Sequence, residues 1–177
     1  MALAVTNAER TPSWCRAGRF VLVLALAAAP AFFAAAAGRR AVWNLSASVP
    51  RGLYWTRPQA PCALGSLVTF QPPGPVARMI RSRGYLPPGA GLLKRVVALP
   101  GDPVCVRQDG YYANGRRIGD VARADRAGRP LAPYSFCGPV SQGSAFVATS
   151  APLSYDSRYF GPVPVASLTV VVPLWTY

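Results

Sequence analysis

An uncharged run of 18 residues, Phe20–Ala37, constrains the fold of this 177-residue chain more than any other feature of its sequence. A helix of that length is just long enough to cross the hydrocarbon core of a membrane. Trp14 and Trp43 lie on either side of the run, as aromatic residues do at membrane interfaces. We therefore expect a transmembrane anchor. A cleavable signal peptide is the alternative, because small residues precede Gly38.

The anchor divides the chain into three expected parts, which are a short N-terminal segment over 1–19, the anchor over 20–38 and a soluble domain over 41–177. Arginines flank both ends of the apolar run, so the distribution of positive charge does not decide which side of the membrane the domain occupies. Aromatic residues near the anchor are candidates for contact with anionic lipid headgroups, with core packing as the alternative for the last of them: Trp43, Tyr54 and Trp55.

The soluble domain reads as mainly β. It is rich in proline and glycine, and its apolar runs are short and β-branched without sustained helical periodicity. We predict an antiparallel β-sheet domain with strands at Leu67–Phe70, Leu92–Leu99, Pro103–Arg107, Tyr111–Ala113, Ala145–Thr149 and Leu168–Leu174. Asn114-Gly115 predicts a two-residue hairpin turn. One short helical turn is expected around Val76–Arg83, inside a proline-rich loop.

The composition excludes several classes of active site. The chain has no histidine, so it cannot build a Ser-His-Asp or Cys-His nucleophile system or a histidine metal site, and we expect neither a metal nor a cofactor. The formal net charge of +13 raises nucleic-acid binding as a function. The arginines are scattered along the chain and no nucleic-acid-binding motif is present, so we expect contact with an anionic membrane instead.

Lys94 is the only lysine among 19 basic residues. Arginine stays protonated at any workable pH, whereas a lysine in an apolar environment can lose its proton and act as a base. General-base chemistry by a nitrogen side chain therefore falls to Lys94. The alternative is a codon bias toward arginine that left one stray lysine.

Three cysteines follow the apolar run, namely Cys62, Cys105 and Cys137. They form no CxxC pair, so a disulfide is favoured over a zinc site. In an oxidising compartment a Cys105–Cys137 bond would close the segment between them and leave Cys62 free. The spacing alone allows any of three pairings, and three reduced, buried cysteines remain the alternative.

Three stretches of the domain together resemble the active-site motifs of the type I signal peptidases, which are membrane-anchored serine proteases with a lysine base. They are Ser46–Gly52 (SASVPRG), Lys94–Asp102 (KRVVALPGD) and Ser154–Gly161 (SYDSRYFG). The pattern Asn44-x-Ser46-x-Ser48-x-Pro50 is more similar to the conjugative-transfer, TraF-type branch than to the housekeeping enzymes. The Gly-Asp-Asn stretch that precedes the third motif in housekeeping enzymes is absent, since Ala148–Leu153 stands there.

The resemblance implies a role for each matching residue. Ser48 would be the nucleophile and Lys94 its general base. The backbone N–H of Ser48 and the hydroxyl of Ser46 would stabilise the oxyanion. Ser154 would orient the Lys94 amine. Asp156 and Arg158 would form an ion pair that shapes the site, with an ordinary turn salt bridge as the alternative.

The same resemblance implies a function and a location. A TraF-type enzyme processes a pilin-like precursor in conjugative DNA transfer, by hydrolysis or by transpeptidation to a cyclic product. It would lie in the bacterial inner membrane, with residues 1–19 cytoplasmic and the catalytic domain periplasmic, in contact with inner-membrane lipids and not with nucleic acid. The alternatives are a housekeeping signal peptidase and a non-catalytic, membrane-tethered assembly factor.

Overall fold

A computed structural model describes residues 40–177, in which Ala41–Tyr177 form a compact unit. The expected segments 1–19 and 20–38 lie outside the described residues. Within 40–177 no helix has the length and apolar character that a membrane crossing requires.

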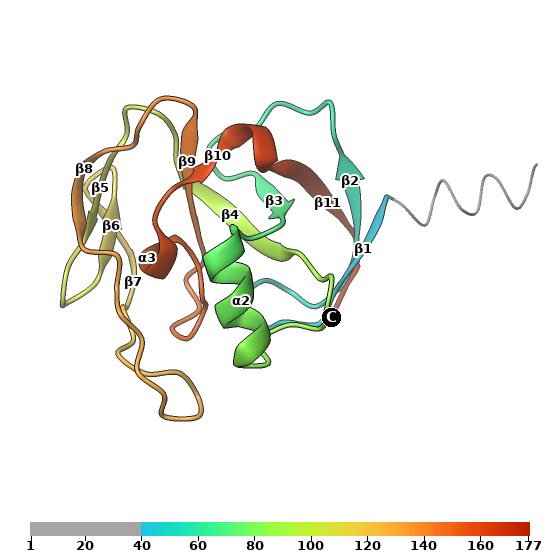
Figure 1. The fold of residues 1–177 in the computed structure, drawn as a ribbon. Coiled ribbons are helices and arrows are strands. Elements are labelled where there is room, and N and C mark those ends of the chain that lie inside the picture. Colours follow the sequence, from blue (N-terminus) through green and yellow to red (C-terminus); the bar gives the residue numbers. More distant parts are fainter. Residues whose placement is uncertain (1–39) are drawn as a thin grey trace, which may run out of the picture. The chain divides into compact units, whose positions relative to one another are not determined.

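Two antiparallel sheets make up the unit and lie side by side (Figure 1). The larger has the strand order β1-β2-β11-β3-β4-β9-β10. Its strands are β1 (Ala41–Asn44), β2 (Gly52–Arg57), β3 (Leu67–Phe70), β4 (Leu92–Ala98), β9 (Ser144–Ala148), β10 (Val163–Pro164) and β11 (Thr169–Thr176). The smaller, in the order β7-β6-β5-β8, contains β5 (Pro103–Val106), β6 (Tyr111–Ala113), β7 (Arg116–Gly119) and β8 (Phe136–Pro139).

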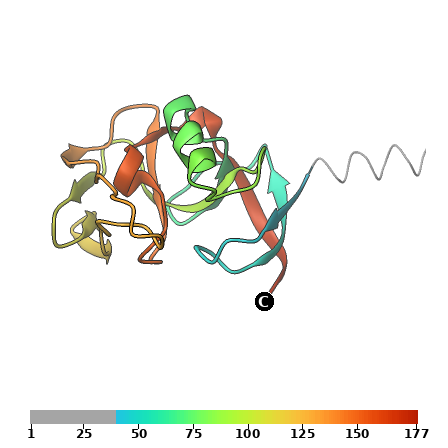
Figure 2. The ribbon, with the colours of Figure 1, turned by 60° about the horizontal axis from the view of Figure 1, so that its bottom comes forward.

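Within residues 40–177 the helices are few and short, as the proline and glycine content predicts. They are α2 (Gly74–Ser82), α3 (Ser157–Phe160) and the 3-10 turn η1 (Val165–Ser167). Both views show α2 lying against one face of the larger sheet (Figure 2). Its buried residue, Ile80, packs there with Val68, Leu92 and Val96. The prediction of a mainly β, antiparallel domain is confirmed.

The predicted strands are present with small differences at their ends, and the helical turn expected around 76–83 is the longer helix α2. The hairpin at Asn114-Gly115 is also present, joining β6 to β7, with both residues at positive φ. The predicted strand ranges did not include β1, β2, β8 and β10, and β7 was indicated only by the hairpin turn that precedes it. These strands are short or exposed on one side, so their apolar periodicity is too weak to detect.

Gly52 opens β2 at a point where two strands approach closely. Its φ is +142°, and a Cβ there would lie 2.0 Å from the carbonyl oxygen of Trp175 on β11. Only glycine fits this crossing. The next residue but one, Tyr54, is buried and donates a hydrogen bond to the Pro50 carbonyl at 2.6 Å. The expectation that Tyr54 faces lipid headgroups is therefore wrong, because its side chain is used to hold the β1–β2 connection.

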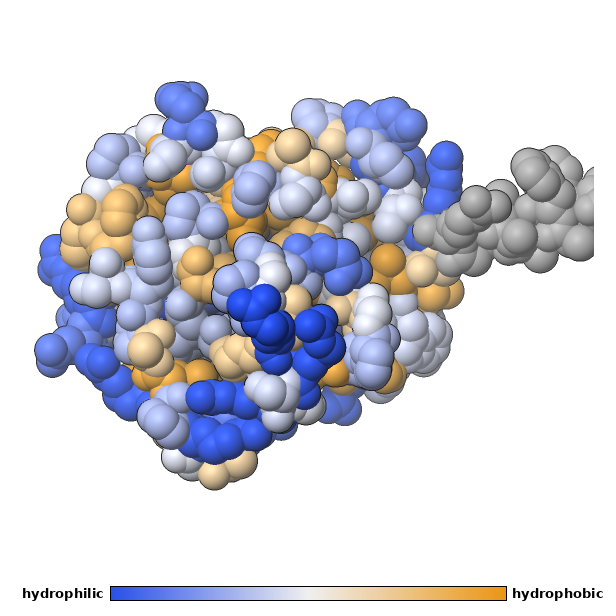
Figure 3. Space-filling model, in the orientation of Figure 1, coloured by the Kyte–Doolittle hydropathy of each residue, from blue (hydrophilic) through white to orange (hydrophobic). Residues whose placement is uncertain are grey.

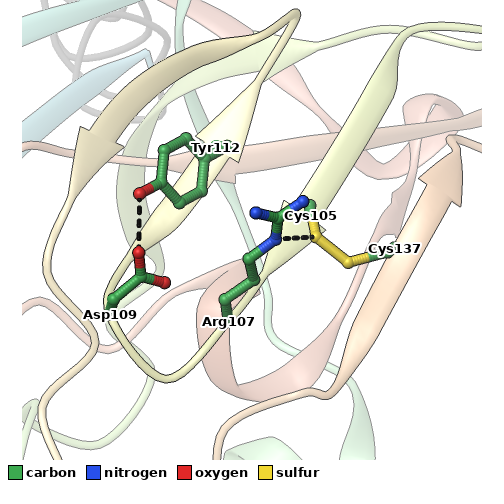
Figure 4. The surroundings of a disulfide bond; sticks show 5 residues. All are labelled: Cys105, Arg107, Asp109, Tyr112 and Cys137. Atoms are coloured by element: carbon green, nitrogen blue, oxygen red, sulfur yellow. Dashed lines mark hydrogen bonds between the residues drawn. A yellow bond between two sulfur atoms is a disulfide. The ribbon is translucent and has the colours of Figure 1, made fainter.

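A disulfide joins Cys105 on β5 to Cys137 on β8, at directly opposed positions of the smaller sheet (Figure 4). Arg107 donates a hydrogen bond to the Cys105 sulfur at 3.0 Å, and Tyr112 donates one to Asp109 at 3.0 Å beside it. Cys62 is the free cysteine of the described residues. The bond crosses the two strands whose connection carries β6, β7 and a long loop.

Loss of this disulfide should destabilise the domain without changing its fold. The two cysteines are 32 positions apart in the sequence. A disulfide that closes a loop of that size lowers the entropy of the unfolded chain and so stabilises the folded state by about 3–4 kcal/mol. We expect the Cys105→Ser/Cys137→Ser variant to melt well below the wild-type protein in thermal denaturation. Added reductant should lower the melting temperature of the wild type and leave that of the variant unchanged; equal melting temperatures would contradict the prediction.

Candidate active site

The connection between β1 and β2 carries two serines that point toward each other. The hydroxyl oxygens of Ser46 and Ser48 are 3.0 Å apart. Asn44, the last residue of β1, fixes this connection with its side-chain amide, and Tyr54 on β2 holds its far end. Val49 anchors the connection below by packing into the core with Tyr54. The serines are therefore presented on a short, restrained loop.

Lys94 reaches this loop from the middle of β4. Alternation along the strand puts its side chain on the same face as Leu92 and Val96, and the side chain is buried. Its Nζ lies 3.0 Å from the Oγ of Ser48 and 2.9 Å from the Oγ of Ser154. A primary amine is thus held between two hydroxyl groups in a mostly apolar environment.

Burial lowers the pKa of Lys94 to about 8, because the ammonium form loses the solvation it has in water. The negative charge of Asp156 opposes this shift and the positive charge of Arg158 adds to it. A substantial fraction of the amine is consequently neutral in weakly alkaline solution. An amine in that state can accept the proton of a neighbouring hydroxyl group.

Ser154 is placed by a buried ion pair. Asp156 and Arg158 are both fully buried, and the guanidinium Nη2 lies 2.8 Å from the Asp156 carboxylate. Arg158 also donates to the carbonyl oxygens of Thr149, Ala151 and Ser154. One side chain therefore ties together several points of the turn before α3, including the residue that contacts the Lys94 amine. The pair is a local contact between residues two apart in a turn, and both of its side chains are fully buried.

The serines and Lys94 line a cleft of about 700 Å³. Its lining includes Ser46, Ser48, Lys94 and Ser154, together with the turn after α2 and the loop between β7 and β8. The Asp125 carboxylate braces that loop, because Tyr85 donates to it at 2.6 Å and Arg129 at 2.7 Å. These contacts hold the pKa of Asp125 well below its usual range. Residues 40–177 contain no cluster of His, Cys, Asp and Glu that could bind a metal ion.

Four of the residues predicted from sequence come together here: Ser46, Ser48, Lys94 and Ser154. Asp156 and Arg158 lie behind them, while Cys105 and Cys137 belong to the smaller sheet. Sequence reasoning assigned no role to Asn44, although it begins the quoted serine motif. The signal available was an asparagine two positions before a serine, a spacing at which its side chain can bond the backbone of the following turn. Asp125 carried no signal in the sequence.

Comparison with known proteins gives one family and several relatives. The family described as signal peptidase, peptidase S26, matches residues 13–175. The plasmid transfer protein TraF of Escherichia coli is 38% identical over 156 residues, covering 80% of this chain and 85% of that protein. The conjugal transfer protein TraF of Agrobacterium tumefaciens (strain 15955) is 39% identical over 145 residues, covering 76% and 81%.

A solved structure of a signal peptidase I from Enterococcus faecalis V583 is 26% identical to this chain. It superimposes with a TM-score of 0.39 and covers 66% of this chain and 99% of that one.

Replacing Lys94 with methionine should stabilise the protein near neutral pH. The pKa of Lys94 is about 8 in the folded state and near 10.5 in the unfolded chain, so the unfolded chain binds the proton more strongly. Wild-type stability should therefore rise between about pH 8 and 10.5. Below about pH 8 the charged, buried Lys94 lowers the free energy of unfolding by a constant amount, up to about 3 kcal/mol. We expect Lys94→Met to have the higher melting temperature at pH 7 and to lack this rise; a lower one would contradict the prediction.

Proposed function

Because this chain belongs to the peptidase S26 family of signal peptidases, we propose that it is a membrane-anchored serine endopeptidase in which Ser48 is the nucleophile and Lys94 the general base. The single observation that carries the proposal is the position of the Lys94 amine, 3.0 Å from the Ser48 hydroxyl in a buried environment. Its lowered pKa matches the requirement for a neutral base near neutrality.

The chemistry follows from these contacts. Neutral Lys94 accepts the proton of Ser48 as the Ser48 oxygen bonds to the scissile carbonyl carbon. The oxyanion receives hydrogen bonds from the Ser48 backbone N–H and the Ser46 hydroxyl. The Lys94 ammonium then gives its proton to the leaving amine as the peptide bond breaks. Water, or an amino terminus of the substrate, displaces Ser48 from the acyl ester. Ser154 keeps the amine aimed at Ser48 throughout.

The first residues of β4 are unpaired on the side where β9 pairs with the rest of the strand, and this short free edge supports binding of a peptide substrate in extended form. Val96 exchanges backbone hydrogen bonds with residues 65 and 66, on the β3 side. By alternation, the backbone groups of Leu93 point to the other side of β4. There β9 pairs only from Arg95 onward, and residues 90–94 line the cleft. A substrate strand can therefore pair with Leu93 and place its scissile bond beside Ser48.

We assign the substrate to the class of pilin-like precursors processed in conjugative DNA transfer. The relatives at 38% and 39% identity are named plasmid or conjugal transfer proteins, and they cover about four-fifths of this chain. The serine loop keeps the Asn-x-Ser-x-Ser-x-Pro pattern of that branch. Hydrolysis and cyclisation are both compatible with an acyl-serine intermediate, depending on which nucleophile reaches it.

The proposed location is the bacterial inner membrane, with the domain on the periplasmic side. A group of exposed apolar side chains supports contact with lipid: Trp43, Leu45, Leu174, Trp175 and Tyr177. Trp43 and Trp175 pack together with ring centroids 6.2 Å apart, so β1 and β11 form one surface. Trp43 lies five positions after residue 38, where the expected anchor ends. Aromatic side chains favour the headgroup region.

The pH dependence of cleavage should report the Lys94 amine. Because the base must be neutral, kcat/KM should rise with pH and level off above about pH 8. Initial rates on a peptide substrate across pH 5.5–10 measure this, the range being set by roughly two to three units either side of that value. A profile that is flat through pH 8, or that falls there, would contradict the assignment.

Processing of a precursor tests the function itself. A pilin-type precursor should be shortened when co-expressed with the wild type, and unchanged with Ser48→Ala or Lys94→Arg. Lys94→Arg keeps the charge but removes the titratable base. Arg95→Lys is the matched control, because Arg95 is the exposed neighbour on β4 and should leave processing intact.

Intact-mass spectrometry of the product distinguishes the two outcomes of acyl transfer, since a cyclic product is lighter than the hydrolysed one by one water. Processing by the Ser48→Ala or Lys94→Arg variant would refute the dyad. Processing of a panel of unrelated preproteins, but not of the pilin-type precursor, would favour the housekeeping alternative.

A further inference from the structure

The Asn44 side chain makes more hydrogen bonds to the serine loop than any other side chain does. It is buried, and its Nδ2 donates to the carbonyl oxygens of Ser46, Val49 and Pro50 at 3.0, 3.2 and 2.9 Å. Its Oδ1 accepts from the Ser46 N–H at 3.1 Å and from the Ser46 hydroxyl at 2.9 Å. The reverse orientation of the amide would set its N–H groups against an N–H donor, so the donor and acceptor ends are fixed.

This orientation sets the direction of a chain of hydrogen bonds. Oδ1 of Asn44 can only accept, so the Ser46 hydroxyl gives its hydrogen to Asn44. The Ser46 oxygen must then accept from the Ser48 hydroxyl, 3.0 Å away. Ser48 has no hydrogen left for Lys94, and its oxygen accepts from the amine. The chain therefore runs from Lys94 through Ser48 and Ser46 to Asn44.

That direction belongs to the state in which Lys94 is protonated. When Lys94 loses its proton, the Ser48 hydroxyl turns its hydrogen to the amine and leaves Ser46. The Ser46 side chain remains held by Asn44, with its oxygen still beside Ser48. Only the hydrogen of Ser46 then has to rotate when an oxyanion forms. The Ser46 oxygen is already at its working position, where the bond from the Ser46 N–H to Asn44 Oδ1 continues to hold the residue, so the reorganisation is limited to that one rotation.

We propose that Asn44 is a positioning residue that acts through Ser46, by holding the Ser46 hydroxyl beside Ser48 so that it reaches the oxyanion through rotation of its hydrogen alone. This role rests on the proposed function. It differs from a purely structural role, in which Asn44 merely ties the loop through its three carbonyl contacts. The two roles depend on different atoms of one side chain, Oδ1 for the first and Nδ2 for the second.

A double-mutant cycle separates the two roles. Asn44→Ala, Ser46→Ala and the double variant are compared as full-length proteins in neutral detergent. The probe is an internally quenched peptide spanning the cleavage site of the precursor above. Loss of one oxyanion donor lowers kcat by about 10²–10³, which we expect for Ser46→Ala. Asn44→Ala should lower kcat by about tenfold or more, with KM unchanged, since the bond to the oxyanion exists only in the transition state.

In the Ser46→Ala background, by contrast, Asn44→Ala should change kcat by less than about threefold, because the hydroxyl it positions is gone. An equal loss of kcat in both backgrounds would overturn the role. Tyr54→Phe is the matched control, since it removes a bond to the same loop at Pro50 without touching Ser46. Its effect on kcat should be the same in both backgrounds.

Asn44→Asp provides a second test if Asn44→Ala does not fold. Aspartate keeps an oxygen acceptor for Ser46 but loses the donors to the three carbonyls. It should lower the melting temperature yet keep kcat within a few-fold of wild type on the alkaline plateau. The comparison is made there because a carboxylate so near raises the pKa of Lys94. A drop in kcat as large as that of Ser46→Ala would overturn the role.

The control Ser48→Ala separates this inference from the proposed function. Cleavage that survives in Ser48→Ala refutes the peptidase mechanism, and with it any role of Asn44 in that mechanism. Cleavage that depends on Ser48 but shows no coupling between Asn44 and Ser46 leaves the peptidase in place and refutes the positioning role alone.

Discussion

The structure around the cleft depends on keeping one amine out of water. Lys94 is buried on β4, and the free energy that this costs the ammonium form is what brings its pKa to about 8. The amine needs polar partners at fixed positions, because a buried polar group without a hydrogen bond is costly. Ser48 and Ser154 provide them from two connections far apart in the sequence. The packing of β4 against β3 and β9 therefore determines the chemistry of the site.

The second partner, Ser154, is only as well placed as the turn that carries it. That turn is held by the fully buried Arg158, which donates to three of its carbonyl oxygens and to Asp156. A buried ion pair contributes little net stability, because desolvation offsets the attraction. Its value here is geometric. A planar guanidinium with several donors can fix a whole turn, and the charge it brings also disfavours the Lys94 ammonium.

The first partner, Ser48, is held by neutral hydrogen bonds and not by an ion pair. Its loop begins at Asn44, ends before Gly52, and is tied by side-chain amide and hydroxyl bonds to backbone carbonyls. Gly52 allows β2 to cross close to β11. Together these contacts let a loop of few residues hold two hydroxyls at hydrogen-bond distance. The cleft is thus bordered by two turns fixed through polar contacts and one strand fixed through apolar packing.

The sequence by itself determined the fold class, most of the strands and which residues were candidates for the site. β-Branched runs and glycine turns indicate local backbone preferences, which are readable without neighbours. Lys94 was identifiable because it is the only lysine, and Ser48 because it lies in a motif. The short strands β1, β8 and β10 were not readable, since their conformation is imposed by the strands they pair with.

Only the tertiary structure decided where the polar groups point. The pairing of Cys105 with Cys137, the burial of Asp156 with Arg158 and the orientation of Asn44 all depend on contacts between distant segments. Tyr54 illustrates the difference, because its place near the expected anchor favoured a lipid contact while its alternation on β2 buried it. Local sequence constrains backbone conformation, whereas burial and hydrogen-bond direction are set by the strand register and packing of the whole domain.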